Sequence, residues 1–276
     1  MRRRHHIALI ALAALLASPF AVAQQPVIRL STTTSTENSG LLAYLLPLFE
    51  SQTKSKVAVI SVGTGKALEL AKNGDVDVTL VHARAAEDKF VAAGYGIDRR
   101  DVMYNDFVIV GPASDPDAIK GGKDVLAAFQ KIAAGNAKFV SRGDNSGTDL
   151  MEKNYWRLAA TRPSASLWVS AGLGMGEVLN MAAELQAYTL SDRATYSTYR
   201  AKTGLVILVE GDPKMFNPYG IIAVNPANQK EVNYKGARLL IEWITSPQGQ
   251  QKIADFKPGG RQLFFPSAAP PMTERK

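Results

Sequence analysis

Short apolar runs rich in β-branched residues alternate along the chain with longer stretches whose apolar residues recur every three or four positions. The short runs have the length and composition of strands, and most are apolar throughout, as in strands buried on both faces of a sheet. The longer stretches have the periodicity of helices with one apolar face. This alternation is typical of the α/β fold class. Strands are predicted at residues 27–31, 57–62, 76–81, 107–110, 138–141, 187–190, 205–209 and 221–224.

The helical stretches lie between these strands. Pro47 lies inside the first and is expected to kink or shorten it, because proline removes a backbone donor and clashes with the preceding turn. After the last helix "KPGG" breaks the pattern, and the proline-containing tail from Phe265 is expected to wrap the surface. Helices are predicted at residues 39–50, 66–73, 149–160, 176–186 and 234–245.

The N-terminal residues have the pattern of an export signal. Arginines at 2–4 precede an apolar run at 7–17, and the small residues at 21–23 form a cleavage pattern. The apolar run is too short for a transmembrane helix, which needs roughly 20 apolar residues. We therefore predict a signal peptide at 1–23 with cleavage near Ala23, and a soluble, periplasmic mature protein.

Composition excludes several classes of partner and chemistry. Removing the signal peptide, which holds three arginines and no acid, lowers the formal net charge from +7 to +4. Lys and Arg are scattered among acids, so a nucleic-acid partner is not expected. The absence of cysteine excludes disulfides and thiol chemistry. Because the mature chain keeps one histidine, His82, we expect neither a histidine-based triad nor a histidine-rich metal site, and we predict no cofactor and no metal.

Three loops rich in Ser, Thr and Gly each follow a predicted strand and open a predicted helix. They are "STTTSTENSG" at 31–40, "SVGTGKALEL" at 61–70 and "SRGDNSGT" at 141–148. A helix N-terminus leaves backbone N–H groups without internal partners and carries a partial positive charge, so it is suited to bind an anion. A single Ser or Thr there is explained by helix capping alone. The three loops together indicate an anion site.

Arg142 supplies the only full positive charge in the third loop. Its guanidinium offers a planar set of five donors that matches a tetrahedral oxyanion. Asp144 is expected to pair with Arg142, and this pairing is compatible with anion binding if the carboxylate orients the guanidinium. Ser146 and Asp149 form a capping pattern for the next helix.

The protonation state of the anion restricts the choice of ligand. An oxyanion that carries no proton at neutral pH needs a site with donors only, whereas phosphate usually carries a proton and needs an acceptor. Asp144 and Asp77 are the candidate acceptors, but orienting Arg142 and solvating or capping a turn are the roles we expect for them. Sulfate is one such proton-free dianion, and only cavity size separates it from other dianions of this kind.

A hydrolase with Ser146 as its nucleophile is the alternative from another functional class, since a glycine follows this serine at a predicted helix start. Such an enzyme needs a base beside the serine. His82 ends a predicted strand and is expected to be a structural residue outside the site. A structural or adhesive envelope protein is a third class, but it would not require three hydroxyl-rich helix starts. We predict a binding protein and not an enzyme.

Several motifs resemble, in the same order, those of the periplasmic tungstate-binding proteins that supply tungstate-uptake ABC transporters. They are "TTTST", "DVDVTLVHARAAEDKFVAAGYG", "RRDVMYNDFVIVGP", "SRGDNSGT" and "YTLSDRATY", and the resemblance covers most of residues 28–225. It implies a two-lobed periplasmic-binding-protein fold of type II, in which each lobe is a mixed sheet flanked by helices and the anion lies in the interlobe cleft. It also implies that tungstate, or alternatively molybdate or phosphate, is delivered to an inner-membrane ABC permease. We expect a monomer.

The resemblance further implies where the chain passes between the lobes. Lobe 1 would be discontinuous, with residues 24–106 and 221–276, and lobe 2 would hold residues 107–220. The crossovers are expected near 104–111 and 217–224, and ligand binding is expected to close the hinge between them.

The same resemblance implies a set of ligand-binding residues. The family often has Asp at position 145 and a basic residue or histidine at 149, where this chain has Asn145 and Asp149. Asp149 is expected either to weaken binding or to favour the helix N-terminus. Gly65 and Gly147 would contribute backbone N–H groups. The side chains expected to contact the anion are those of Thr33, Thr34, Thr64, Arg142, Ser146 and Thr148.

Overall fold

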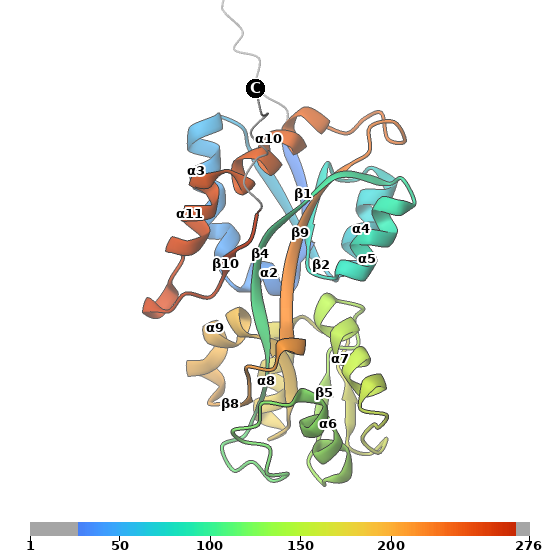
Figure 1. Cartoon of the computed structure of the whole chain (residues 1–276), viewed down its shortest axis with the longest axis vertical. Coiled ribbons are helices and arrows are strands. Elements are labelled where there is room, and N and C mark those ends of the chain that lie inside the picture. The colour runs from blue at the N-terminus through green and yellow to red at the C-terminus, as the bar shows by residue number, and fades with distance from the viewer. Residues whose placement is uncertain (1–26, 269–276) are drawn as a thin grey trace, which may run out of the picture.

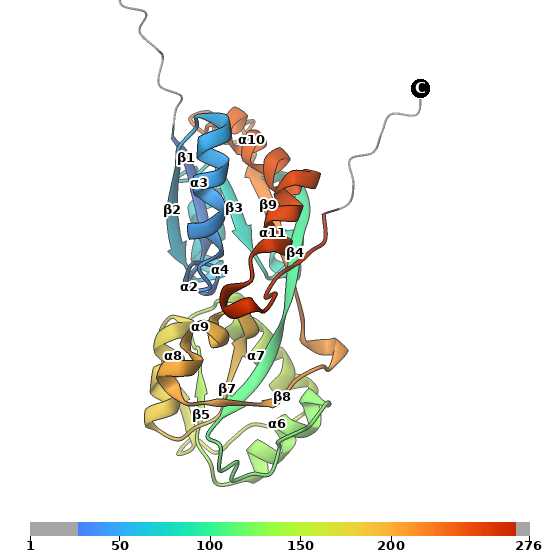
Figure 2. The same ribbon diagram turned by 90° about the vertical axis from the view of Figure 1, so that its left-hand side faces the viewer.

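Two groups of helices and strands are joined by two long strands, β4 (Gly96–Gly111) and β9 (Phe216–Val224), in an elongated molecule (Figure 1). This computed structural model describes residues 27–268, so the predicted signal peptide lies outside the described residues. We refer to the two groups as the upper and the lower lobe. Viewed from the side, β4 runs through both of them (Figure 2).

The upper lobe is a mixed sheet with helices on both faces. Its strands besides β4 and β9 are β1 (Ile28–Thr33), β2 (Val57–Val62), β3 (Val78–Val81) and β10 (Phe265–Pro266). Its helices are α2 (Thr34–Asn38), α3 (Leu41–Thr53), α4 (Thr64–Asn73), α5 (Arg84–Ala92), α10 (Tyr234–Thr245) and α11 (Pro247–Asp255). The strand order is β10-β4-β9-β3-β1-β2, in which β1 is parallel to β2 and β3, and β9 is antiparallel to β3 and β4.

Apolar side chains from both faces of this sheet form the upper core. Leu41, Leu45 and Phe49 on α3 pack with Trp243 on α10 against one face, whereas Phe90 on α5 packs against the other. Burial of such side chains contributes roughly 1.5–3 kcal/mol each. The sheet is thereby held rigid, and the ends of β1, β2 and β3 present their loops to the lower lobe (Figure 1).

The lower lobe is built around the second half of β4. Its strands are β5 (Phe139–Ser141), β6 (Trp168–Ser170), β7 (Thr189–Asp192) and β8 (Val206–Val209), and its helices are α6 (Val125–Ala134), α7 (Gly147–Leu158), α8 (Met175–Glu184) and α9 (Arg193–Thr203). β7 and β8 pair antiparallel with β4, and β5 pairs in parallel with β6. Its core includes Phe129, Phe139 and Trp156. The predicted α/β fold, with mixed sheets flanked by helices, is confirmed.

The pairing of β4 changes partner at the passage between the lobes. Asp106 of β4 still pairs with Phe216 of β9, whereas Phe107, the next residue, pairs with Asp192 of β7. Residues 218–224 of β9 pair with the upper-lobe part of β4. We therefore propose one crossover at about 106–107, within the expected range, and a second one just before Asn217, earlier than the expected 217–224.

Each predicted strand and helix overlaps an observed one, but some elements were not predicted. Pro47 does not end α3, which continues to Thr53, because the helix buries apolar side chains on both sides of the proline. The first half of β4 was missed, as were α2, α5, α6, α9 and α11. No helix within residues 27–268 is long and apolar enough to cross a membrane.

Candidate anion-binding site

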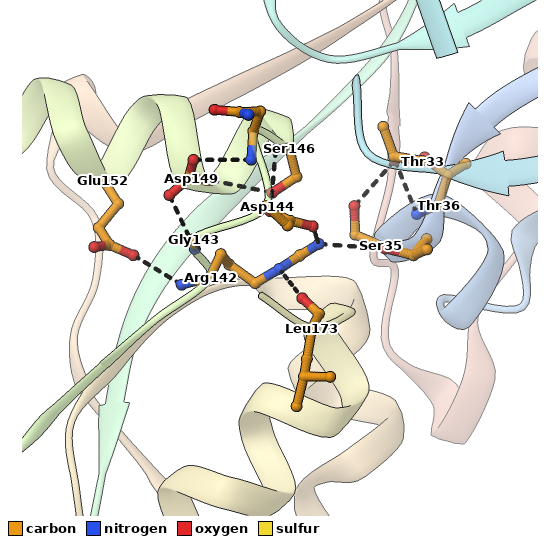
Figure 3. Close-up of polar contacts among 12 residues, drawn as sticks. Thr33, Ser35, Thr36, Arg142, Gly143, Asp144, Ser146, Asp149, Glu152 and Leu173 are labelled. Carbon is orange, nitrogen blue, oxygen red and sulfur yellow. Dashed lines mark hydrogen bonds and ion pairs between the residues drawn. The ribbon is translucent and has the colours of Figure 1, made fainter. Parts of the chain in front are cut away.

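Arg142 is fully buried at the junction of the two lobes, directly after β5. Its Nε donates to the Leu173 carbonyl at 2.9 Å, and its Nη2 donates to Asp144 Oδ2 and to Thr34 Oγ1, the latter at 3.3 Å (Figure 3). Thr34 belongs to the upper lobe, so the guanidinium connects the two lobes. The remaining nitrogen, Nη1, is buried and has no hydrogen-bond partner among residues 27–268. One charged donor is thus held in place and available to a ligand.

The carboxylate of Asp144 is fully engaged by its own loop. Oδ2 accepts from Arg142, and Oδ1 accepts the backbone N–H of Ser146 at 3.0 Å. Asp77 lies elsewhere: it precedes β3, pairs with Arg29 at 2.6 Å and accepts the N–H of Asn233 at 2.8 Å. Asp77 is therefore at the far end of the strand from the site, and neither carboxylate has an oxygen facing an anion.

Asp149 and Ser146 shape the start of α7. Ser146 Oγ accepts the N–H of Asp149 at 3.2 Å, which is the predicted N-cap. The buried Asp149 carboxylate accepts the N–H groups of Gly143 at 3.1 Å and Asn145 at 3.0 Å (Figure 3). Of the two roles expected for Asp149, the structure supports the structural one, because its oxygens point back into its own loop.

The loop at the start of α4 packs directly on the loop at the start of α7. Gly65 N–H donates to the Asn145 carbonyl at 3.3 Å, and a Cβ on Gly63 would lie only 2.9 Å from the Asp144 carbonyl oxygen. Gly63 is therefore needed for the close approach. Thr64 and Thr148, in the first turns of α4 and α7, are buried, and their hydroxyls have no hydrogen-bond partner among the described residues.

A cluster of hydroxyls lies at the end of β1. Thr33 caps α2, accepting the N–H of Thr36 at 3.3 Å, and its Oγ1 lies 3.0 Å from Ser35 Oγ and 2.7 Å from Thr36 Oγ1. The imidazole of His82, at the end of β3, joins this cluster through Nε2, which lies 3.0 Å from Ser35 Oγ and 3.1 Å from Thr33 Oγ1. Within this cluster the Thr33 hydroxyl already has several partners.

Comparison with known proteins gives the family. The sequence matches the model of the PBP superfamily domain over residues 21–248. It is 49% identical over 244 residues, 87% of this chain and 85% of the relative, to the tungstate-binding protein TupA of Peptoclostridium acidaminophilum. This chain belongs to the PBP superfamily and, within it, to the TupA family. Among solved structures it is similar to the tungstate ABC transporter protein of Geobacter sulfurreducens, with 52% identity, a TM-score of 0.78 and coverage of 83% of this chain and 98% of that one.

A second solved structure extends this similarity. TupA from Desulfovibrio alaskensis G20 is 49% identical, with a TM-score of 0.75 and coverage of 88% of this chain and all of that one. The resemblance in the sequence motifs is thereby confirmed as TupA family membership, and the predicted two-lobed fold of the superfamily is confirmed with it.

In this TupA-family chain the structure gathers all eight predicted ligand-binding residues into three contacting loops. Side-chain donor atoms with no partner among the described residues are offered by Thr64, Arg142 and Thr148, and Thr34 lies beside the guanidinium of Arg142. Ser146 and Thr33 act as helix caps. Sequence reasoning missed several groups from outside the loops that contact them. Among them are His82, the Leu173 carbonyl, Glu152 and Thr195.

His82 was expected to be a structural residue outside the site, and the structure places its ring against the hydroxyl cluster at the end of β1. Its ring bonds to the hydroxyl cluster, and burial lowers the pKa of the imidazole to about 4, with the positive charge of Arg142 adding to the effect. The histidine is therefore neutral at physiological pH. The run of six hydroxyl residues at 31–36 was the only signal in the sequence for a partner of this kind, and it did not single out His82.

Two buried carboxyl groups near the loops have raised pKa values. Burial raises the pKa of Glu152 to about 8, although it accepts N–H donors from Arg142 and Trp156. Burial also raises the pKa of Asp192 to about 6; its Oδ2 caps α9, and its Oδ1 is buried with no hydrogen-bond partner among the described residues. At neutral pH Glu152 is therefore largely uncharged and repels an anion less, whereas Asp192 is mostly ionised.

The geometry does not support the hydrolase alternative. Ser146 Oγ serves as a helix cap, and His82 directs both ring nitrogens to other residues, so no base faces this serine. Residues 27–268 also contain no group of three His, Asp or Glu side chains placed to hold a metal ion. The site is suited to binding by hydrogen bonds.

Proposed function

We propose that this protein binds tungstate at the junction of its lobes and delivers it to the permease of an ABC transporter. The observation that carries the proposal is the set of buried donors with no hydrogen-bond partner in the part of the chain that the structure describes: Thr64 Oγ1, Thr148 Oγ1 and Arg142 Nη1. Buried polar groups are normally hydrogen-bonded. Three donors in two contacting loops, two of them at helix N-termini, match the oxygens of a tetrahedral anion.

A site made of donors favours an anion without protons. Both oxygens of Asp144 are occupied, and Asp77 is remote, so the two acceptors considered from the sequence do not serve a protonated ligand. The names of the similar proteins, which specify tungstate, favour tungstate over the other proton-free dianions, molybdate and sulfate.

Phosphate is the alternative that one observation favours. Asp192 is buried, and its Oδ1 has no hydrogen-bond partner among the described residues. Its Oδ2 accepts the N–H of Thr195, whose hydroxyl donates to the Ser35 carbonyl at 3.1 Å beside the hydroxyl cluster. A carboxylate in this place could accept the proton of hydrogen phosphate. If phosphate is the ligand, Asp192 is the acceptor, rather than Asp144 or Asp77.

The two lobes are proposed to close over the ligand. The Arg142 to Thr34 hydrogen bond joins the lobes, and the continuous strands β4 and β9 provide the hinge. We further propose a periplasmic protein, released by cleavage near Ala23, that acts as a monomer and binds no nucleic acid. Its role is capture and release, without chemistry on the ligand.

Calorimetric titration of the mature, anion-free protein tests the ligand directly. Tungstate, molybdate, phosphate and sulfate are titrated separately at neutral pH. We expect tight binding of tungstate, with sulfate and phosphate weaker by orders of magnitude. Tight binding of phosphate alone would identify a phosphate receptor, and the Asp192→Asn variant should then lose it. No heat with any of the four would overturn the proposal.

A further inference from the structure

His82 connects the hydroxyl cluster to the strand that passes between the lobes. Its Nε2 faces Thr33 and Ser35, as described above, and its Nδ1 lies 2.9 Å from Oδ1 of Asn217 at the start of β9. Asn217 pairs across the ladder with Asn105 of β4, next to the proposed crossover between the lobes. One side chain thus touches both the proposed ligand loop and the proposed hinge.

The partners of Asn217 fix which imidazole nitrogen carries the proton. The Asn217 amide nitrogen donates to Asn105 Oδ1 at 2.6 Å. The amide oxygen of Asn217 therefore faces His82 and must accept, so Nδ1 of the ring bears the hydrogen. Since burial keeps the ring neutral, Nε2 has a lone pair and accepts a hydrogen bond from the hydroxyl of Ser35 or Thr33.

Packing keeps the ring in this orientation. The imidazole stacks on Tyr219 of β9, with centroids 4.7 Å apart and an interplanar angle of 25°. On its other side a Cβ on Gly147 would come within 2.8 Å of the ring, so α7 of the lower lobe also lies against it. His82 is therefore enclosed by the upper lobe, the crossover strand and the first residue of α7.

We propose that His82 is a positioning residue: as the neutral Nδ1–H tautomer it fixes the direction of the Ser35 and Thr33 hydroxyls and ties them to Asn217 of the crossover strand. It does not itself contact the anion. The consequence is that the hydroxyl loop, which also carries the Arg142 partner Thr34, and the hinge are set together. This inference rests on the proposed function of the same site.

Two substitutions of His82 separate its hydrogen bond to Asn217 from its hydrogen bond to the hydroxyl cluster. His82→Gln can present an acceptor near the position of Nε2 but loses the donor to Asn217, whereas His82→Asn can keep a donor near Nδ1 but loses the acceptor for the hydroxyls. One lost hydrogen bond corresponds to about a tenfold change in affinity. We expect His82→Asn to weaken tungstate binding at least about tenfold, and His82→Gln to recover part of that loss. Affinity unchanged in His82→Asn, or equal losses in both, would overturn the inference.

Destabilisation without a positioning role is controlled by Tyr188→Phe. This buried tyrosine lies in the lower core and donates to Asp115, away from the three loops. We expect this variant to unfold more easily and to keep the wild-type affinity. Thermal unfolding without anion is measured for every variant, and affinities are compared only among folded ones.

The tautomer is measured in the wild-type protein, so the inference does not depend on variants that fold. The mature chain has one histidine, and labelling histidine with ¹⁵N therefore gives a single ring in the spectrum. We expect a protonated Nδ1 and an unprotonated Nε2 at neutral pH. A ring protonated at Nε2 would overturn the inference. Silence of the wild type toward tungstate would instead refute the proposed function, while the ring signals still report the tautomer.

Discussion

At the scale of single residues, Arg142 is the group through which the proposed ligand and both lobes interact. Arg142→Ala removes a charged donor and leaves the Asp144 carboxylate without its partner beside the anion. Hydrogen bonds to charged groups contribute about 1.5–3 kcal/mol, and 1.4 kcal/mol is a factor of ten. We expect tungstate affinity to fall by roughly ten- to a hundredfold or more, as measured by calorimetry.

Arg162→Ala is the matched control for Arg142. Arg162 is an exposed arginine of the lower lobe that lies over the Trp168 ring, with no contact to the three loops. It removes the same net charge, so an equal loss of affinity in both variants would attribute the effect to overall charge. Unchanged affinity in Arg142→Ala would contradict the site assignment.

Glu152 gives a prediction for pH. Burial raises its pKa from 4.5 to about 8, so the folded protein holds this proton more tightly than the unfolded chain. The stability that comes from the protonated group is complete below pH 4.5 and is lost as the pH rises through about 8. Glu152→Gln imitates the neutral form, and its stability relative to wild type should increase by about 1 kcal/mol or more between about pH 5 and pH 8.

Urea unfolding of both proteins across this pH range measures the difference in the free energy of unfolding. Comparing each variant with wild type cancels contributions from His82 and Asp192, whose pKa values are also shifted. Glu69→Gln, at an exposed position on α4, is the control and should show no such trend. A parallel pH dependence of Glu152→Gln and wild type would show that Glu152 is charged in the fold.

Residue types at helix starts were predictable from the sequence, whereas their partners from distant segments were not. The three loops and Arg142 were singled out because helix N-termini and guanidinium groups have local chemistry that a short motif reveals, whereas Thr64 and Thr148 as ligand contacts were implied by the family resemblance. His82 and Asn217 are 135 positions apart, and their contact depends on how β3 and β9 pair. Asp77 and Asp144 had equal standing as acceptors in the sequence, and only the fold separates them.

At the scale of elements, the start of α7 is held by Asp149. Its carboxylate accepts two backbone N–H groups of the loop and is fully buried. Asp149→Ala leaves these donors unpaired, and we expect a loss of about 1.5–3 kcal/mol in the free energy of unfolding, measured by urea without anion. The loosened loop should also bind tungstate more weakly, although Asp149 does not face the ligand.

Asp88→Ala is the control for this element. Asp88 pairs with Arg84 on the exposed face of α5 at a spacing of four residues, and such pairs contribute about 0.2–0.5 kcal/mol. If Asp149→Ala costs no more than this, the carboxylate does not organise the loop. A large loss of stability with full affinity would show that the loop reforms around the anion.

The first half of β4 was not predicted because its sequence resembles a loop. The first half of β4 reads "GIDRRDVMYND", and its four consecutive charged residues at 98–101 resemble a loop. In the structure Asp98 has a φ of 53°, and the pairing register shifts beside it. The charged residues therefore lie at an irregularity of a long strand that passes through both lobes. The pairing with β9 on one side and β10 on the other makes this segment a strand, and local periodicity does not reveal that pairing.

At the scale of the whole molecule, the alternation of strands and helices predicted an α/β protein but not two lobes. Division into lobes came from the resemblance to a family, because it depends on where β4 and β9 exchange partners rather than on any local pattern. Both the two-lobed fold and the position of the site depend on this exchange of strand partners. It brings Thr34 of the upper lobe against Arg142 of the lower lobe, and the hydrogen bond between them is one of several that join the lobes, with those from Gly65 to Asn145 and from Thr195 to Ser35.

Closure by ligand can be measured between α5 and α7, which face each other across the junction (Figure 1). Because the chain has no cysteine, Lys89→Cys and Arg157→Cys, at exposed positions on these helices, accept two spin labels without further changes. We expect tungstate to shorten and narrow the distance distribution, since Thr64 belongs to the upper lobe and Arg142 and Thr148 to the lower one, so that an anion bound to all three would tie the lobes together. In the Arg142→Ala background this shift should largely disappear. A label pair within the upper lobe, Lys72→Cys with Lys89→Cys, is the control and should not respond to tungstate. If the distance distribution of the interlobe pair is identical with and without tungstate, the protein is closed before the anion binds. Entry of the anion would then require transient opening of the hinge.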